Sequence, residues 1–239
     1  LISKLSRDHR IDPDRIYVTG HSMGGHLSWR SGIYLGDRWG AVSPMSGGYD
    51  YVKDRQVYTL FNVAGYATCG NEEPYEIAKF NGIIRDWMAA HAYPWTMVEK
   101  KGGHEVFPDE LPKVVEFFQD HPRNPYPAKV CARLGLTLAN EQADKNDQWH
   151  RQHAWRAGRG IPTSTFHWIR FLEPSVKAED GAVRFQEVWA VNDGANTIAI
   201  TADNCRKLRV HLHERMVDFA KPVKITVNGE TLFEKRVEP

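Results

Sequence analysis

The sequence predicts an α/β domain, with a parallel sheet and flanking helices, followed by a small antiparallel β-sandwich. In residues 1–124, short apolar segments typical of strands alternate with longer segments of helical periodicity. Strict alternation of strand and helix indicates parallel strands connected by helices on the faces of the sheet. Residues 125–239 contain short runs of alternating polarity between turn residues, as antiparallel strands do. Three prolines within residues 121–127 mark the boundary, because proline interrupts regular structure.

The first half is expected to contain four strands and three helices. Apolar residues at spacings of three and four, such as Ile77, Phe80 and Ile84, define the buried face of one helix. The expected strands are Arg15–Thr19, Ala41–Met45, Tyr58–Ala64 and Trp95–Glu99. The expected helices are Gly24–Leu35, Tyr75–Ala92 and Leu111–Asp120.

The second half contains several short strand-like runs and clear turn signals. The pair Asn228-Gly229 favours a two-residue hairpin, because both residue types tolerate positive φ. Asn192-Asp193-Gly194 marks another turn, and the polar segment Glu141–Gly160 is interpreted as a long connection. The expected strands are Phe166–Leu172, Val183–Val191, Thr197–Thr201, Leu208–Leu212 and Val223–Val227.

Composition excludes several classes of protein. The 239 residues are 41% hydrophobic and 26% charged, with a net charge of +1, so neither nucleic acid nor a membrane surface is an expected partner. No apolar stretch reaches the length of a membrane span, about 18 residues or more. Three widely spaced cysteines argue against a disulfide framework and a zinc ribbon. Cysteine usage does not identify the cellular compartment of the protein. Secretion or the periplasm is favoured if a signal lies upstream.

A motif for a nucleophilic serine lies between the first expected strand and the first long helix. The pattern G-x-S-x-G is matched by Gly20, His21, Ser22, Met23 and Gly24. In such a strand-turn-helix motif, called a nucleophile elbow, the serine lies at a strained turn with its hydroxyl exposed at the carboxyl end of the sheet. Glycines at both flanking positions are expected to let strand and helix approach closely. Ser22 is the candidate nucleophile, the Met23 N–H a candidate oxyanion donor, and His21 a support for the turn.

The serine needs a general base, and His104 is placed to supply it. His104 follows Gly102 and Gly103 in the loop directly after the last expected strand, Trp95–Glu99. Loops at the carboxyl ends of parallel strands converge at one edge of the sheet. The chain order serine, acid, histidine puts the base at this strand.

These segments resemble the α/β-hydrolase superfamily. The resemblance is carried by DPDRIYVTGHSMGG, SPMSGG and GGH, the last before a helix that leads to RNPYP, and it covers about residues 11–128. It is closest to the branch of polyhydroxyalkanoate-depolymerase-like and feruloyl-esterase-like carboxylesterases, and the C-terminal half resembles a β-domain appended to some bacterial members. It implies that Ser22 is the nucleophile, His104 the general base and the Met23 N–H one oxyanion donor.

A serine hydrolase needs an acidic residue to complete a catalytic triad with the serine and the histidine. In this chain the position of that acid departs from the pattern of the branch. Its members carry an aspartate after the strand that precedes the histidine strand, in a pattern like H-G-x-x-D, where this chain has Thr68. Glu72 is the first choice for the acid, with its neighbour Glu73 as the close alternative. Asp50, after the preceding strand, is a further alternative. A chain without a functional acid is the remaining one.

The strand of the nucleophile is expected to need a further neighbour. The resemblance implies several strands before it, whereas few residues precede Arg15–Thr19 in this chain. An open edge would leave hydrophobic surface and backbone groups unpaired. We therefore expect an upstream segment or a second chain to pair with this edge and to supply the second oxyanion donor.

Together these features predict a serine hydrolase that cleaves small or polymeric carboxylic esters through an acyl-enzyme, without a cofactor or metal. A prolyl-oligopeptidase-like serine peptidase is one alternative, because the same elbow serves amide cleavage. A non-catalytic binding protein with a degenerate triad is the other. The C-terminal half is expected to hold no triad residue, since none of its serines lies in an elbow.

Overall fold

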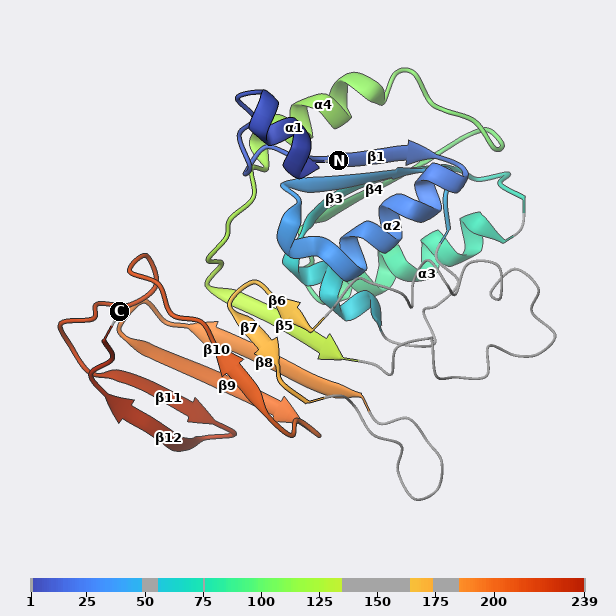
Figure 1. The fold of residues 1–239 in the computed structure, drawn as a ribbon. Helices are drawn as coiled ribbons and strands as arrows, with labels where there is room; N and C mark the ends of the chain where they lie inside the picture. The colour runs from blue at the N-terminus through green and yellow to red at the C-terminus, as the bar shows by residue number, and fades with distance from the viewer. Residues whose placement is uncertain (1, 49–55, 75, 135–163, 174–184, 239) are drawn as a thin grey trace. The chain divides into compact units, whose positions relative to one another are not determined.

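A computed structural model describes residues 2–48, 56–74, 76–134, 164–173 and 185–238. The chain divides into two compact units, Leu1–Pro125 and Tyr126–Pro239, one residue beyond the boundary expected from the prolines. Figure 1 shows the elements of each unit with the labels used below. Of the helices that the structure describes, none combines the length and the apolar character needed to cross a membrane.

The first unit is built on a four-stranded sheet in the order β1-β2-β3-β4. Every neighbouring pair is parallel, and helices lie on both faces of the sheet (Figure 1). This confirms the predicted fold class of a parallel sheet with flanking helices. The strands are β1 (Val18–His21), β2 (Ala41–Met45), β3 (Ala64–Gly70) and β4 (Trp95–Lys100).

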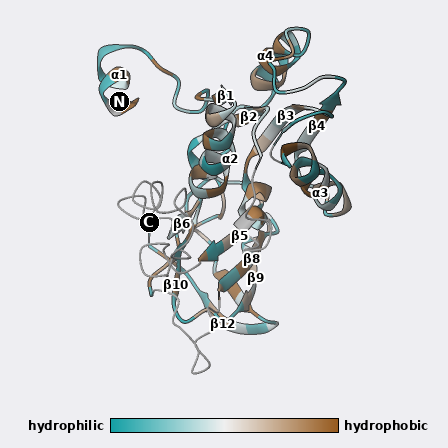
Figure 2. Cartoon of the chain, turned by 90° about the vertical axis from the view of Figure 1, so that its right-hand side faces the viewer, coloured by the Kyte–Doolittle hydropathy of each residue, from teal (hydrophilic) through white to brown (hydrophobic). Residues whose placement is uncertain are grey.

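Helices α2 and α3 cover one face of this sheet and α4 the other. On the first face, Trp29 and Ile84 are fully buried against Val42, whereas on the second Val114 packs with Tyr66. Hydrophobic and hydrophilic residues are mixed along α3 and α4, as amphipathic packing requires (Figure 2). The helices are α1 (Ile2–Asp8), α2 (Met23–Leu35), α3 (Ile77–Ala90) and α4 (Leu111–Asp120), with 3₁₀ turns η1 (Gly36–Arg38) and η3 (Gln56–Asn62).

The predicted strand Tyr58–Ala64 is wrong. Most of this run forms η3, and its side chains Val57 and Leu60 enter the core from a helical turn. A short apolar run does not distinguish a buried strand from a buried helical turn. Strand β3 therefore begins only at Ala64 and includes Thr68, which we expected in the loop that follows.

Strand β1 is an edge strand in the part of the chain that the structure describes. It begins at Val18 rather than at the predicted Arg15, and it pairs with β2 alone. No described residue occupies the place of the further strand that the sequence leads us to expect beside it.

The second unit contains a five-stranded sheet, β12-β11-β9-β8-β5, and a three-stranded sheet, β10-β7-β6. Residues of both sheets, including Val130, Ile169 and Ile198, share one hydrophobic core. The strands are β5 (Lys129–Leu134), β6 (Thr165–Phe166), β7 (Ile169–Phe171), β8 (Gln186–Asn192), β9 (Thr197–Asp203), β10 (Leu208–Val210), β11 (Val223–Val227) and β12 (Glu230–Lys235).

The second unit departs from the expected antiparallel strands in two places. Strands β9 and β11 pair in parallel, so the expectation of a wholly antiparallel domain is wrong for this pair. The run Phe166–Leu172 forms the hairpin β6–β7 rather than one strand. The hairpin at Asn228-Gly229 is confirmed, with φ of 50° and 88° at the two turn residues. Glu141–Gly160 lies outside the described residues.

Hydrogen bonds around the buried Glu110 carboxylate hold the first turn of α4 against the sheet. Tyr66 of β3 donates a hydrogen bond to Glu110 Oε2 at 2.7 Å, and the ammonium groups of Lys100 and Lys113 donate to Oε1 at 3.1 and 2.9 Å. Burial would raise the pKa of Glu110, but these hydrogen bonds outweigh it and lower the pKa to about 2. Lys100 and Glu110 lie on either side of His104 in the sequence, so their hydrogen bond joins the two ends of the segment that carries His104.

We expect Tyr66→Phe to lower the free energy of unfolding by about 1.5 to 3 kcal/mol, because the Glu110 carboxylate loses a buried donor. The pKa of Glu110 in the folded protein lies below its ordinary 4.5. Its contribution is therefore fully present at neutral pH and is lost as the pH falls from about 4.5 toward 2. Urea unfolding of both proteins across this range measures the difference, which should shrink with falling pH.

Tyr17→Phe is the matched control for this substitution. The Tyr17 hydroxyl is also buried but has no hydrogen-bond partner among the described residues. Its removal should leave stability unchanged or raise it slightly. Equal losses in the two variants would show that the bond to Glu110 contributes nothing of its own.

Candidate active site

The turn between β1 and α2 holds Ser22 in a strained backbone conformation. Its φ is 58° and its ψ −116°, a region that residues other than glycine rarely adopt. The Ser22 N–H donates to the carbonyl of Met45, and the Ser22 carbonyl accepts from the N–H of His26, both at 3.0 Å. The Ser22 hydroxyl does not cap α2, which leaves Oγ for other contacts.

Glycines permit this turn, but not in the way the motif suggests. A Cβ at Gly20 would lie 2.7 Å from the backbone of Gly24, so the first glycine of the motif is required for space. A Cβ at Gly24 itself would meet nothing within 4 Å, and the expected need for glycine there is wrong. The second close approach belongs to Gly25, where a Cβ would lie 2.5 Å from the carbonyl oxygen of Met45.

The structure brings Ser22, His104 and one glutamate into a continuous hydrogen-bonded chain. His104 Nε2 lies 2.7 Å from Ser22 Oγ, and His104 Nδ1 lies 2.7 Å from Oε2 of Glu73. An ionised carboxylate only accepts hydrogen bonds, so Nδ1 carries the proton of a neutral imidazole. Nε2 is then unprotonated and accepts the hydrogen bond of the Ser22 hydroxyl.

Glu73, not Glu72, contacts the imidazole, so the first choice of Glu72 is corrected. The Glu73 side chain is fully buried, with 0% exposure, and its Oε1 accepts from the Gly70 N–H at 3.4 Å. Glu72 is exposed, and its N–H donates to the carbonyl of Gly102 at 2.9 Å. Asp50, the further alternative, lies outside the described residues.

The loops that carry Glu73 and His104 are joined along their backbones. The N–H of Asn71 donates to the carbonyl of Lys100 at 2.8 Å, next to the bond between Glu72 and Gly102. A Cβ at Gly70 would overlap the carbonyl oxygen of Gly102. Gly70 is thus the sequence signal that we missed: a glycine at the end of β3 that allows the two loops to touch.

His21 lies beside His104. Its ring centroid is 5.1 Å from that of His104, with the planes tilted by 44°. Its Nε2 is buried and has no hydrogen-bond partner among the described residues. The His21 ring thus lies next to the imidazole of His104.

The first two turns of α2, directly after Ser22, carry two exposed apolar side chains. Met23 is the first residue of α2, where a backbone N–H has no acceptor within the helix. Met23 and Leu27, one turn apart on the same face, are 72% and 61% exposed. The start of α2 next to Ser22 thus offers an unpaired backbone N–H and exposed apolar surface.

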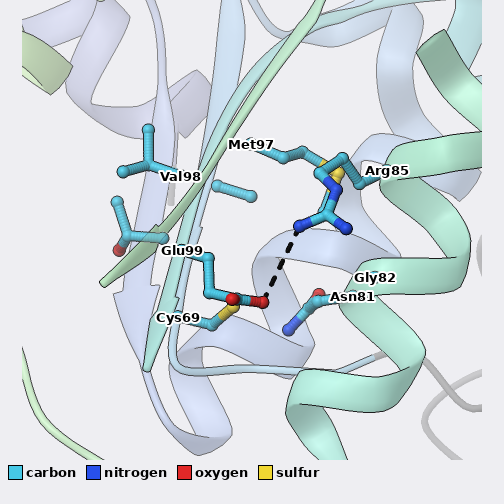
Figure 3. Close-up of a pocket in the computed structure, with 9 residues that line it drawn as sticks. Cys69, Asn81, Gly82, Arg85, Met97, Val98 and Glu99 are labelled. Atoms are coloured by element: carbon cyan, nitrogen blue, oxygen red, sulfur yellow. Dashed lines mark ion pairs between the residues drawn. The ribbon is translucent and has the colours of Figure 1, made fainter. Parts of the chain in front are cut away.

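A small pocket lies between α3 and the strands β3 and β4 (Figure 3). Arg85 and Glu99 form an ion pair there at 3.7 Å. Burial, then the charges of Glu99 and Glu73, raises the pKa of the Cys69 thiol to about 11. Cys69 is thus protonated at neutral pH and does not compete as a nucleophile. The pocket is lined by Ala67, Thr68, Cys69, Asn81, Gly82, Arg85, Met97, Val98 and Glu99.

In the described part of the chain, no three His, Cys, Asp or Glu side chains are grouped so that they could hold a metal ion. The polar centre of the candidate site is the hydrogen-bonded chain from Ser22 to Glu73.

Comparison with known proteins finds similarity at the level of three-dimensional structure. No family model and no curated protein matches the sequence. A thermostable esterase is 20% identical over 51% of this chain and 35% of its own, with a TM-score of 0.43. S-formylglutathione hydrolase from Staphylococcus aureus is 15% identical over 49% of this chain and 57% of its own, with a TM-score of 0.39.

A carboxylesterase from Bacillus cereus is 13% identical over 50% of this chain and 56% of its own, with a TM-score of 0.39. The chain thus spans between about a third and three fifths of the length of these structures. These partial structural neighbours are named as esterases and hydrolases.

Proposed function

We propose that this protein is a serine hydrolase of carboxylic esters, with Ser22 as nucleophile, His104 as general base and Glu73 as the acid. The observation that carries the proposal is the hydrogen-bonded chain from Ser22 Oγ through His104 to Glu73, with both contacts at 2.7 Å. Its members follow β1, β4 and β3, and the serine and histidine are 82 residues apart in the sequence. A strained serine, an oriented imidazole and a buried carboxylate at one sheet edge form a unit suited to nucleophilic catalysis.

In the acylation step, Ser22 Oγ attacks the carbonyl carbon of the ester while its proton passes to His104 Nε2. Glu73 accepts the Nδ1–H bond and stabilises the positive imidazolium that results. The carbonyl oxygen becomes an oxyanion, toward which the Met23 N–H donates at the start of α2. Collapse of this intermediate breaks the bond to the alcohol oxygen, which takes the proton from Nε2 and leaves as the free alcohol.

In the deacylation step, a water molecule replaces the alcohol. His104 Nε2 removes a proton from the water, whose oxygen attacks the acyl carbon bound to Ser22. The second tetrahedral intermediate releases Ser22 Oγ, which recovers its proton from the imidazolium. The product is a carboxylic acid, and the neutral imidazole is restored.

The free edge of β1 has a place in this proposal. We propose that a further strand, from an upstream segment or a second chain, pairs with this edge. A loop from the same strand, close to Ser22, would donate the second hydrogen bond to the oxyanion. The proposal is supported by the pairing of β1 with β2 alone among the described residues.

The exposed pair Met23 and Leu27 favours an ester with an apolar acyl or alcohol group. Each methylene that leaves water contributes about 0.8 kcal/mol when fully buried. A butyrate ester is therefore expected to have a higher kcat/KM than the acetate ester of the same alcohol.

The test is hydrolysis of p-nitrophenyl acetate and butyrate, together with labelling by a fluorophosphonate, which reacts with activated serines. An ester hydrolase turns over both esters and is labelled at Ser22. Labelling combined with efficient cleavage of a peptide and poor cleavage of esters would identify a serine peptidase instead. A binding protein with a degenerate site would neither turn over the esters nor take the label.

A further inference from the structure

We infer that Ser46 is a positioning residue that holds the loop of His104 at a fixed place relative to Ser22. Ser46 directly follows β2 and is completely buried. Its hydroxyl donates to the carbonyl oxygen of Glu105 at 2.7 Å, one residue beyond His104. The inference rests on the proposed function, because it assigns Ser46 a task in the same site.

The end of β2 is connected to the turn of Ser22, to the loop of His104 and to strand β3, which precedes the loop of Glu73. The carbonyl of Met45 accepts from the N–H of Ser22 at 3.0 Å, while the N–H of Ser46 donates to the carbonyl of Thr68 in β3 at 2.8 Å. Two consecutive residues thus hold the nucleophile through one bond and the loop of the base through another. The distance between Ser22 Oγ and His104 Nε2 depends on this common support.

The segment after Ser46 is held firmly enough to serve as a support. The carbonyl of Gly47 accepts from Trp29 Nε1 of α2 at 3.1 Å and from Asn81 Nδ2 of α3 at 2.9 Å. Figure 3 shows Asn81 on the side of α3 that faces the sheet. A Cβ at Gly47 would lie 2.5 Å from the backbone of Gly25, so the segment also packs directly on α2.

The backbone of Ser46 indicates that its hydroxyl is needed. Its φ is 45°, in the left-handed region that glycine adopts freely and other residues adopt at a cost. A chain under no other demand would favour glycine at this position. Strain kept at a residue whose side chain holds the base loop points to a functional requirement.

Loss of this bond should act on the geometry of His104 and not on substrate binding. The Glu105 carbonyl would be released from β2, and the imidazole would lose its fixed distance to Ser22. Small displacements of catalytic groups slow the chemical step strongly. The consequence is a lower kcat with little change in KM.

The test compares Ser46→Ala with the wild-type chain. We expect kcat for p-nitrophenyl butyrate and the rate of fluorophosphonate labelling to fall about tenfold, with KM changed by less than about twofold. The Nδ1–H proton of His104, held by Glu73, is expected as a downfield resonance in the proton NMR spectrum. His104→Asn assigns this resonance by removing it. In Ser46→Ala the resonance should broaden or move upfield.

Thr59→Val is the matched control, because Thr59 also donates a buried hydroxyl bond to a carbonyl, that of Ile33, at 2.8 Å. It should lower thermal stability while leaving kcat and the His104 resonance as in the wild type. Ser46→Gly, which relieves the strain at φ 45°, replaces Ser46→Ala if that variant does not fold.

Wild-type labelling and an unchanged resonance in the Ser46 variants, or equal losses in Thr59→Val, would overturn the inference. A wild-type chain that reacts with neither ester nor probe would refute the proposed function. The NMR comparison would still decide whether Ser46 positions His104.

Discussion

Replacing Ser22 by alanine is expected to lower kcat/KM for p-nitrophenyl butyrate by about 10⁴-fold or more, because the proposed mechanism needs the Ser22 hydroxyl to carry the acyl intermediate. Alanine keeps the Cβ and the backbone demands of the elbow, where φ is 58°. Cys69 offers no substitute, since its thiol is buried and protonated at neutral pH. Fluorophosphonate labelling should disappear together with turnover.

Ser28→Ala is the control for loss of a serine hydroxyl close to Ser22 in the sequence, in the helix that follows it. Ser28 Oγ donates to the carbonyl of Gly24 at 2.8 Å, and it takes no part in the chain to His104. This variant should keep labelling and turnover within about twofold of the wild type, with some loss of stability. Labelling that persists in Ser22→Ala would show that another residue is the nucleophile.

The places of Ser22 and His104 could be predicted because they depend on chain order and not on fine geometry. Each follows a strand of a parallel sheet, and the carboxyl ends of such strands meet at one edge. Errors of a few residues in the strand bounds did not disturb this. Strand β1 starts later than expected, yet Ser22 still lies between it and α2.

Which glutamate contacts His104 could not be chosen from the sequence, for two physical reasons. The apolar run in η3 resembles a strand, which placed the end of β3 too early and made Thr68 the reference point. The side-chain directions of two consecutive glutamates depend on the loop backbone. That backbone is set by contacts with residues 100–102, about thirty positions away in the chain.

The pairing of strands in the second unit could also be predicted only in part. The strands that carry clear alternation and turn signals are present, and so is the hairpin at Asn228-Gly229. The parallel pair β9–β11 leaves no local signal, because a strand with a given pattern can pair in either direction. Partners and orientation depend on distant contacts in the shared core.

Glu73→Gln is expected to lower kcat/KM by about 10³- to 10⁴-fold, even though the two side chains have nearly the same shape. The carboxylate of Glu73 accepts the Nδ1–H of His104 at 2.7 Å and opposes the charge of the imidazolium formed during attack. An amide provides no negative charge. When its NH₂ group faces Nδ1, it also favours the tautomer whose Nε2–H points at Ser22 and cannot accept a proton.

Glu72→Gln is the control that separates the two neighbours, since it removes the same charge one residue earlier in the chain. Glu72 is exposed and contributes only its backbone N–H, which the substitution keeps. Its kcat/KM should stay within about twofold of the wild type, and the downfield proton of His104 should persist. In Glu73→Gln that proton should move upfield, or disappear where the Nε2–H tautomer forms. A larger loss in Glu72→Gln than in Glu73→Gln would contradict the geometry. Small losses in both would mean that the imidazole is oriented by another carboxylate, for which Asp50→Asn is the next variant to measure.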